Sequence, residues 1–179
     1  MKRSLFVAAL VGVAFVPFAA HAQINAVKPV SIGIAAGASL PTSDLSDVAQ
    51  TGWNVTGTVG LNPTMIPLGI RIDGAYNRYG LKDGVDGHLA VTSVTGNLVY
   101  KFPSVSLSPY AIGGAGWCHL EGSVTAIGSD SENDFCWNVG AGISMPLSGF
   151  NTFIEARYNQ IQQDGFSSKF IPITFGVMF

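Results

Sequence analysis

Hydrophobic and polar residues alternate along most of the chain beyond residue 30, and a period of two is typical of β-strands. The last ten residues, "FIPITFGVMF", show the pattern clearly, because the odd-numbered positions 171–179 are all apolar. No helical period of 3.6 residues is sustained, and the 22 glycines disfavour helices. The pattern predicts an all-β protein with eight antiparallel strands at 30–40, 52–62, 68–80, 89–102, 109–120, 135–145, 151–161 and 170–179.

The two faces of these strands differ in charge as well as in hydrophobicity. Most of the few charges within strands share the polar face, and these are Arg71, Asp73, Lys101, Glu155 and Arg157. Arg78, near one end of its strand, is the exception. The polar face therefore reads as the enclosed one and the apolar face as the outer one. This inverted pattern is typical of a transmembrane β-barrel.

The predicted connections alternate in the same way. Polar, acid-rich links at 41–51, 82–88, 123–134 and 162–167 take turns with short links at 63–67, 103–108 and 146–149, all of which contain proline. Up-and-down barrels of the outer membrane have long external loops and short periplasmic turns. Both ends of the barrel segment then lie on the side of the short turns.

Aromatic residues gather near the strand ends. One set lies beside the long links (Trp53, Tyr76, Tyr79, Trp117, Trp137 and Tyr158) and the other beside the short ones (Tyr100, Phe102, Tyr110, Phe153 and Phe179). Two aromatic girdles are expected where a barrel meets the two membrane interfaces. Alternation alone would also fit a soluble β-sandwich. The charge placement and the girdles favour an eight-stranded antiparallel up-and-down transmembrane β-barrel.

The N-terminal residues predict export. "MKRSLFVAALVGVAFVPFAAHAQ" has a basic start, an apolar run and an Ala-His-Ala cleavage site, so residues 1–22 read as a signal peptide and 23–179 as the barrel domain. The alternative is a membrane-spanning helix, but the apolar run is shorter than the ~20 residues that spanning requires. Seven basic and eleven acidic residues remain in 23–179, which makes nucleic acid an unexpected partner.

Several segments resemble the small eight-stranded outer-membrane β-barrel family, which includes OmpX-like proteins and the barrel domain of OmpA. They are "GIAAGASLPTSDLSD", "GIRIDGAYNRYG", "SPYAIGGAG", "FIEARYN" and "IPITFGVMF". The resemblance implies a location in the bacterial outer membrane. It also implies that the terminal residues Phe175, Val177 and Phe179 are the signal read by the outer-membrane assembly machinery. We expect a monomer without a cofactor that contacts outer-membrane lipid and lipopolysaccharide.

An eight-stranded barrel is just wide enough for side chains to fill its interior. Charges held there must be paired, and Arg71 with Asp73 or Glu155, and Arg157 with Glu155, are the expected partners. Lys101 and the amides of Asn54, Asn62, Asn97 and Asn138 complete the predicted inward set. This composition favours a filled interior and a structural or surface role through acidic loops, such as adhesion, ligand contact or membrane integrity. Small inward residues at 31–37 keep a narrow pore for solutes as an alternative.

Two further kinds of site are weaker hypotheses. Some small barrels are enzymes that use His with Ser or Asp near the outer rim, and His88, His119, Asp86 and Ser123 lie in that region, but no nucleophile motif surrounds them. We therefore expect no catalytic activity. Asp130, Glu132 and Asp134 offer oxygen ligands for Ca²⁺, although the spacing is not that of an EF-hand loop. A solvated acidic loop is the favoured interpretation.

The two cysteines flank the third acidic link. Cys118 and Cys136 have numbers that sum to 254, and so do Trp117 and Trp137. One antiparallel register would therefore place both couples opposite each other. An exported protein enters an oxidising compartment, where neighbouring thiols form a disulfide. Two free thiols in a slipped register are the alternative.

Overall fold

The computed structural model describes residues 30–63, 67–82, 87–103, 107–124, 128–163 and 166–179. They form one closed barrel in which each strand pairs antiparallel with its neighbours in sequence and the last pairs with the first. The strands are β1 (Val30–Thr42), β2 (Gly52–Leu61), β3 (Leu68–Gly80), β4 (Gly87–Lys101), β5 (Ser108–Val124), β6 (Gly128–Leu147), β7 (Phe150–Gln163) and β8 (Phe166–Met178). The predicted fold class is confirmed, and the predicted signal peptide lies outside the described residues.

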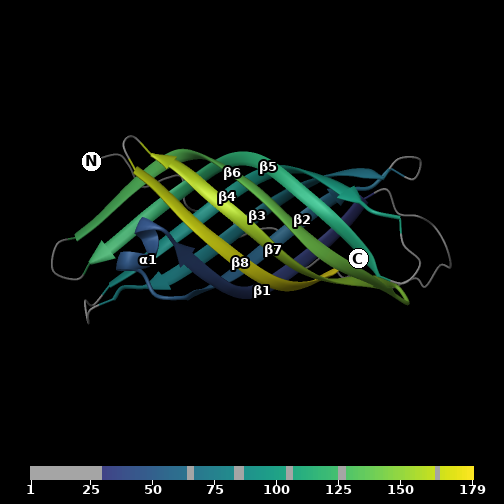
Figure 1. Cartoon of the computed structure of the whole chain (residues 1–179), viewed down its shortest axis with the longest axis horizontal. Coiled ribbons are helices and arrows are strands. Elements are labelled where there is room, and N and C mark those ends of the chain that lie inside the picture. The colour runs from purple at the N-terminus through teal and green to yellow at the C-terminus, as the bar shows by residue number, and fades with distance from the viewer. Residues whose placement is uncertain (1–29, 64–66, 83–86, 104–106, 125–127, 164–165) are drawn as a thin grey trace, which may run out of the picture.

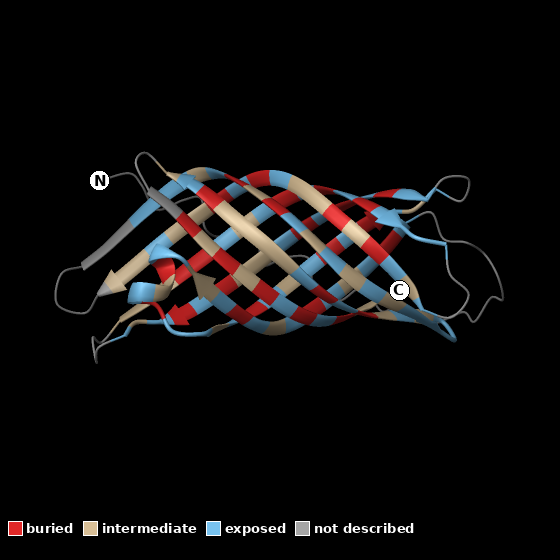
Figure 2. Ribbon diagram, viewed as in Figure 1, coloured by how far each residue is buried: buried red, intermediate tan, exposed pale blue. Residues whose placement is uncertain are grey.

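Exposure alternates along each strand as the sequence pattern predicts (Figure 2). In β1, Ile32 and Ile34 are exposed while Ser31 and Ala35 are buried. The exposed apolar side chains therefore cover the outside of the barrel. None of the helices in the described part of the chain is long and apolar enough to cross a membrane.

Pro172 interrupts one ladder, as expected from its missing N–H. Pairing between β7 and β8 runs from Asn151 to Ala156 and resumes at Asn159. Pro172 still has a partner in β1, where it lies opposite Ser39. The barrel thus tolerates this proline by giving up a short part of one ladder.

The acidic links differ from the prediction, because strands replace most of two of them. β5 continues to Val124 and β6 begins at Gly128. In the same way, β7 continues to Gln163 and β8 begins at Phe166. Polar, acidic sequence predicts a loop, but a strand that continues beyond the apolar band can also be polar on both faces. The link at 41–51 holds a short helix, α1 (Asp44–Val48).

Helix α1 lies at the end of the barrel opposite the C-terminus (Figure 1). Its Leu45 and the following Ala49 are buried within an apolar cluster that includes Tyr79, Ile161 and Phe170. A second apolar cluster, containing Val99, Tyr110 and Phe153, lies nearer the short turns. The interior therefore has an apolar layer toward each end, with polar residues between them.

Three aromatics assigned to the girdles belong to these interior layers instead. Tyr79, Tyr110 and Phe153 are each at most 6% exposed. The ring planes of Tyr79 and Phe170 make an angle of 69°, and the ring centroids are 6.1 Å apart. The Tyr79 hydroxyl also forms a 2.6 Å hydrogen bond with the hydroxyl of Ser39. Other members of the predicted girdles do face outward, such as Trp53 and Tyr76, whose ring centroids are 5.4 Å apart.

Candidate functional site

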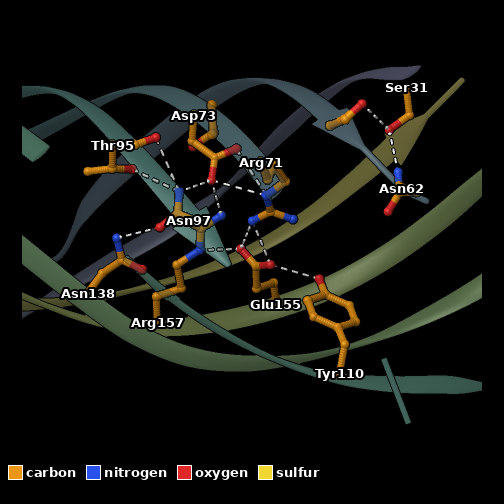
Figure 3. A network of polar contacts seen from close by, with 12 residues as sticks. Ser31, Asn62, Arg71, Asp73, Thr95, Asn97, Tyr110, Asn138, Glu155 and Arg157 are labelled. Atoms are coloured by element: carbon orange, nitrogen blue, oxygen red, sulfur yellow. Dashed lines mark hydrogen bonds and ion pairs between the residues drawn. The ribbon is translucent and has the colours of Figure 1, made fainter. Parts of the chain in front are cut away.

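Glu155, on β7, is the centre of the polar layer. Its carboxylate accepts hydrogen bonds from Nη2 of Arg71 at 2.8 and 2.9 Å, from Nε of Arg157, and from the hydroxyl of Tyr110 at 2.8 Å (Figure 3). The Arg71 and Glu155 side chains are only 6% and 3% exposed. A carboxylate buried to this degree needs several charge-assisted donors, and this one has them on three sides.

Asp73, on β3, is the second anion of the layer. It lies 3.1 Å from Nε of Arg71 and 2.8 Å from Nη2 of Arg157, so each arginine contacts both carboxylates. The contact between Asp73 and Arg157 was not among the predicted pairs. Two cations face two anions in this network, so the charges of the layer balance.

Inward-facing asparagine side chains extend the network inside the barrel. Asn97 donates to Asp73 at 2.8 Å, and Asn138 donates to the side-chain oxygen of Asn97 at 2.9 Å. Asn54 donates to Asn77 at 2.8 Å nearer the α1 end. The contacts around Asp73 join the consecutive strands β3 and β4 to β6 and β7, a pair that lies far from them in sequence, through their inward side chains.

Lys101 does not belong to this network, contrary to the prediction. It is exposed at the end of β4, and its Nζ donates to Oδ1 of Asn62 at 3.0 Å. Asn62 in turn donates to the hydroxyl of Ser31. Lys101 follows Asn97 by four strand residues, about 13 Å, which places it at the rim where water can solvate its charge.

Little space remains around the network. A cavity of about 30 Å³ is lined by residues that include Thr58, Asp73, Arg157 and Phe170. That volume is enough for about one or two water molecules. The apolar layer at the α1 end and the second cluster lie on either side of the charges along the barrel. The described interior is therefore filled mainly by side chains.

Cys118 and Cys136 form a disulfide, as the sequence predicts, with their Cα atoms 5.8 Å apart. The predicted register is wrong by two residues, because Cys118 pairs with Asp134 and Cys136 with Gly116. The bond is thus diagonal across the ladder. A shift of two keeps both side chains on the same face, so the thiols still meet inside the barrel. Both half-cystines belong to the apolar cluster under α1.

Beyond the disulfide, β5 runs to Val124 and β6 begins at Gly128, and we call the segment 119–135 the acidic hairpin. It contains Glu121, Asp130, Glu132 and Asp134 and no lysine or arginine. β6 pairs with β5 from Gly128 but with β7 only from Phe135, so the hairpin continues past the end of that ladder. Six strand residues beyond Cys118 correspond to a length of about 20 Å.

The three acids considered as weak calcium candidates, Asp130, Glu132 and Asp134, lie on β6 within this hairpin rather than in a loop. Glu132 is exposed and accepts a hydrogen bond from Gln163 at 3.2 Å, and Asp134 is half-buried. The side chain of Asp130 lies outside the described residues. Among the described side chains, no group of three or more His, Cys, Asp or Glu is arranged to hold a metal ion.

The two histidines near the rim do not form a catalytic arrangement in the described part of the chain. His88 pairs with Ser123 across β4 and β5, but no hydrogen bond joins their side chains there. His119 lies 2.9 Å from Oδ1 of Asn133, its cross-strand partner. Asp86 lies outside the described residues. Nucleophilic catalysis requires a base within hydrogen-bond reach of the nucleophile.

The C-terminal strand has the predicted orientation. Phe175 and Phe179 are exposed on the outer face and Val177 is half-buried there. The backbone of Phe179 exchanges two hydrogen bonds with Ile32, at 2.8 and 3.0 Å, which closes the barrel at its last residue. Recognition of these residues by the assembly machinery stays a prediction.

Comparison with known proteins agrees with this geometry. The family model described as "Outer membrane protein beta-barrel domain" matches residues 6–179. A search of curated proteins finds no match.

Three of the solved structures that share this fold have names that describe a surface protein, an attachment protein and an enzyme. Neisserial surface protein A has 19% identity and a TM-score of 0.66, covering 84% of this chain and 96% of its own. Ail, the attachment invasion locus protein of Yersinia pestis, in complex with the heparin analogue sucrose octasulfate, has 25% identity, coverages of 84% and 97%, and a TM-score of 0.52. The outer membrane enzyme PagL has 17% identity, coverages of 83% and 98%, and a TM-score of 0.51.

The closed eight-stranded barrel, its inverted polarity and the family match agree. The chain belongs to the outer-membrane β-barrel protein family and is located in the bacterial outer membrane.

Proposed function

We propose that this protein is a non-conducting surface barrel that contacts an external ligand of cationic character through its acidic hairpin. The observation that carries the proposal is the hairpin itself, which has four acidic residues and no lysine or arginine and is closed at its base by the disulfide. A surface fixed in this way loses little conformational entropy when a ligand binds. The filled interior supports a role outside the lumen.

The charge of the hairpin suggests a ligand unlike that of Ail. The Ail structure holds a polyanion, sucrose octasulfate. Like charges would weaken binding of a polyanion to residues 119–135 of this chain, whereas lysine-rich or arginine-rich partners would be attracted. The shared fold therefore supports a surface role, while the local charge argues for a different ligand class.

We also propose that the protein is not an enzyme, although PagL has the same fold. Fold does not determine function, so the argument depends on the site. The support comes from His88 and His119, because in the described residues neither lies in hydrogen-bond reach of a Ser, Thr or Cys nucleophile.

Binding of a lysine-rich peptide by the purified protein in zwitterionic nanodiscs tests the hairpin proposal. Replacing residues 121–131 with an Asn-Gly turn keeps the disulfide and removes Glu121 and Asp130, so it should weaken binding about fivefold, since two charge contacts of about 0.2–1 kcal/mol each are lost. Glu121→Gln with Glu132→Gln also removes two acids, without shortening the hairpin, and should give a loss of similar size. Both effects should shrink as salt is added.

The matched control removes two acids at α1, Asp44→Asn with Asp47→Asn, and should leave peptide binding nearly unchanged. Surface plasmon resonance with immobilised lysine-rich peptide compares the variants with the wild type. The same measurement with immobilised heparin compares a cationic ligand with an anionic one. Equal binding by the wild-type protein and the hairpin replacement would contradict the proposal, as would preferential binding of heparin.

A further inference from the structure

One face of helix α1 is turned toward the barrel interior at the end opposite the C-terminus (Figure 1). Leu45 on this face is 3% exposed and the following Ala49 is fully buried, whereas Val48 on the other face is 55% exposed. The cluster that surrounds Leu45 and Ala49 contains an inward-facing residue from every strand from β3 to β8, namely Tyr79, Val91, Cys118, Cys136, Ile161 and Phe170. A segment meets a ring of this kind only where it lies over the lumen.

The disulfide belongs to the same ring of residues beneath α1. Cys118 and Cys136 are 3% and 2% exposed. A thiol reagent reduces a disulfide by direct attack of its thiolate on one of the two sulfur atoms, so the rate depends on access to that sulfur. The buried position of both half-cystines implies that part of the structure has to move before a reagent reaches them.

Helix α1 is the segment whose movement costs the barrel least. It lies between β1 and β2 in the chain, outside both of their ladders, and a helix of five residues gains little stability from its own hydrogen bonds. Its end is held to the chain after β3 by the bridge between Ala49 and Leu81 and by the Lys82 N–H, which donates to the Val48 carbonyl at 2.9 Å. Burial of Leu45 supplies the apolar contact. The helix can therefore open locally while the strands stay paired.

We propose that α1 is a lid that shields the disulfide from thiol reductants, and that reduction in the folded protein requires Leu45 to leave the apolar cluster. When dithiothreitol is the reductant, one of its thiolates attacks a cystine sulfur and its second thiol then displaces the mixed disulfide. The reagent ends as its cyclic disulfide, and its two hydrogens end on the thiols of Cys118 and Cys136. The closed lid keeps the base of the acidic hairpin covalently fixed, whichever ligand the hairpin binds.

The rate at which excess dithiothreitol reduces the purified protein in zwitterionic nanodiscs tests the lid. Leu45→Ser should be reduced about tenfold faster than the wild type or more, because removal of a buried leucine side chain destabilises the closed lid and leaves the open one nearly unaffected. Samples quenched with acid, alkylated and analysed by mass spectrometry give the number of free thiols at each time.

Val48→Ser is the matched control, since it removes an apolar side chain from the exposed face of the same helix. Its reduction rate should stay within about twofold of that of the wild type. Altered gel mobility without heating verifies that each variant is folded, and Leu45→Ala replaces Leu45→Ser if the latter fails to fold.

The dependence of the reduction rate on urea separates opening of the lid from unfolding of the whole barrel. Opening of α1 exposes little surface, so the wild-type rate should change little at urea concentrations well below the unfolding transition. A steep rise that follows global unfolding would overturn the proposal, because the disulfide would then be reached only in the unfolded protein.

The proposal is also overturned if Leu45→Ser and Val48→Ser are reduced at the same rate. Reduction of the folded wild-type protein as fast as that of the urea-unfolded protein would overturn it as well, since the lid would then give no protection. None of these measurements includes the lysine-rich peptide, so a failure of the hairpin proposal would leave all of them unchanged.

Discussion

Glu155→Ala is expected to lower the free energy of unfolding by about 3–5 kcal/mol, because breaking a buried ion pair leaves its partners without compensation. Arg71 and Arg157 would share one remaining carboxylate, Asp73, and the Tyr110 hydroxyl would lose its acceptor. Urea unfolding in phosphatidylcholine vesicles, followed by tryptophan fluorescence, measures the change.

Glu155→Gln is the matched variant, since it keeps the size of the side chain and an acceptor oxygen but removes the charge. Its loss of stability should be smaller than that of Glu155→Ala. On the outer face of the same strand, Ile154→Ala exchanges one exposed side chain for another and controls for the position. A loss below about 1 kcal/mol for Glu155→Ala would mean that water solvates these charges as it does at an exposed pair.

Removing the disulfide is expected to cost about 3 kcal/mol, because the bond closes a loop with a sequence separation of 18 residues. Cys118→Ala with Cys136→Ala should therefore unfold at lower urea concentration. It should also increase proteolysis within residues 119–135, whose base the bond closes. The cysteines are buried beneath α1, so part of any loss in the variant comes from packing.

The wild-type protein unfolded in the presence of a reductant separates the two contributions, since it keeps both sulfur atoms but lacks the bond. The difference between oxidised and reduced wild type should account for most of the loss. Mass spectrometry after alkylation of freshly isolated outer membranes gives the direct check. Two alkylated thiols there would contradict the disulfide.

The face of each residue could be predicted from the sequence because strand geometry is regular. Side chains alternate strictly, and few charges fell on the apolar face, so Arg71, Asp73, Glu155 and Arg157 could be assigned to one interior. In an up-and-down barrel each strand pairs with the next one along the chain, and β8 pairs with β1 to close the barrel, so the strand pairing follows from chain order. The alternation therefore predicts one shared face for these four side chains, although it also places Lys101 there, which lies at the rim.

Errors arose where residue type was given more weight than alternation. Phe153 has the parity of Glu155, and Tyr79 has the parity of Asn77, so both could have been assigned to the interior. Their aromatic character alone favours the girdles. Tyr110 was harder, since the glycines at 113, 114 and 116 obscure the two faces of β5.

Register and strand length depended on information that a single sequence lacks. The equal sums of the Cys and Trp pairs suggested a register two residues away from the observed one, and a diagonal disulfide fits the cysteine spacing equally well. The burial of Leu45 depends on α1 folding toward Phe170 of a distant strand. Such contacts are decided by tertiary packing, which overrides the local pattern.

Single-channel recording in planar lipid bilayers tests the filled interior most directly. The charges of Arg71, Asp73, Glu155 and Arg157 are paired across the lumen and only about 30 Å³ remains open beside them, so folded wild-type protein should give no steady conductance. A 16-stranded porin reconstituted in the same way provides the conducting control. Large, steady current steps from the wild-type protein that rise with salt concentration would contradict the filled interior.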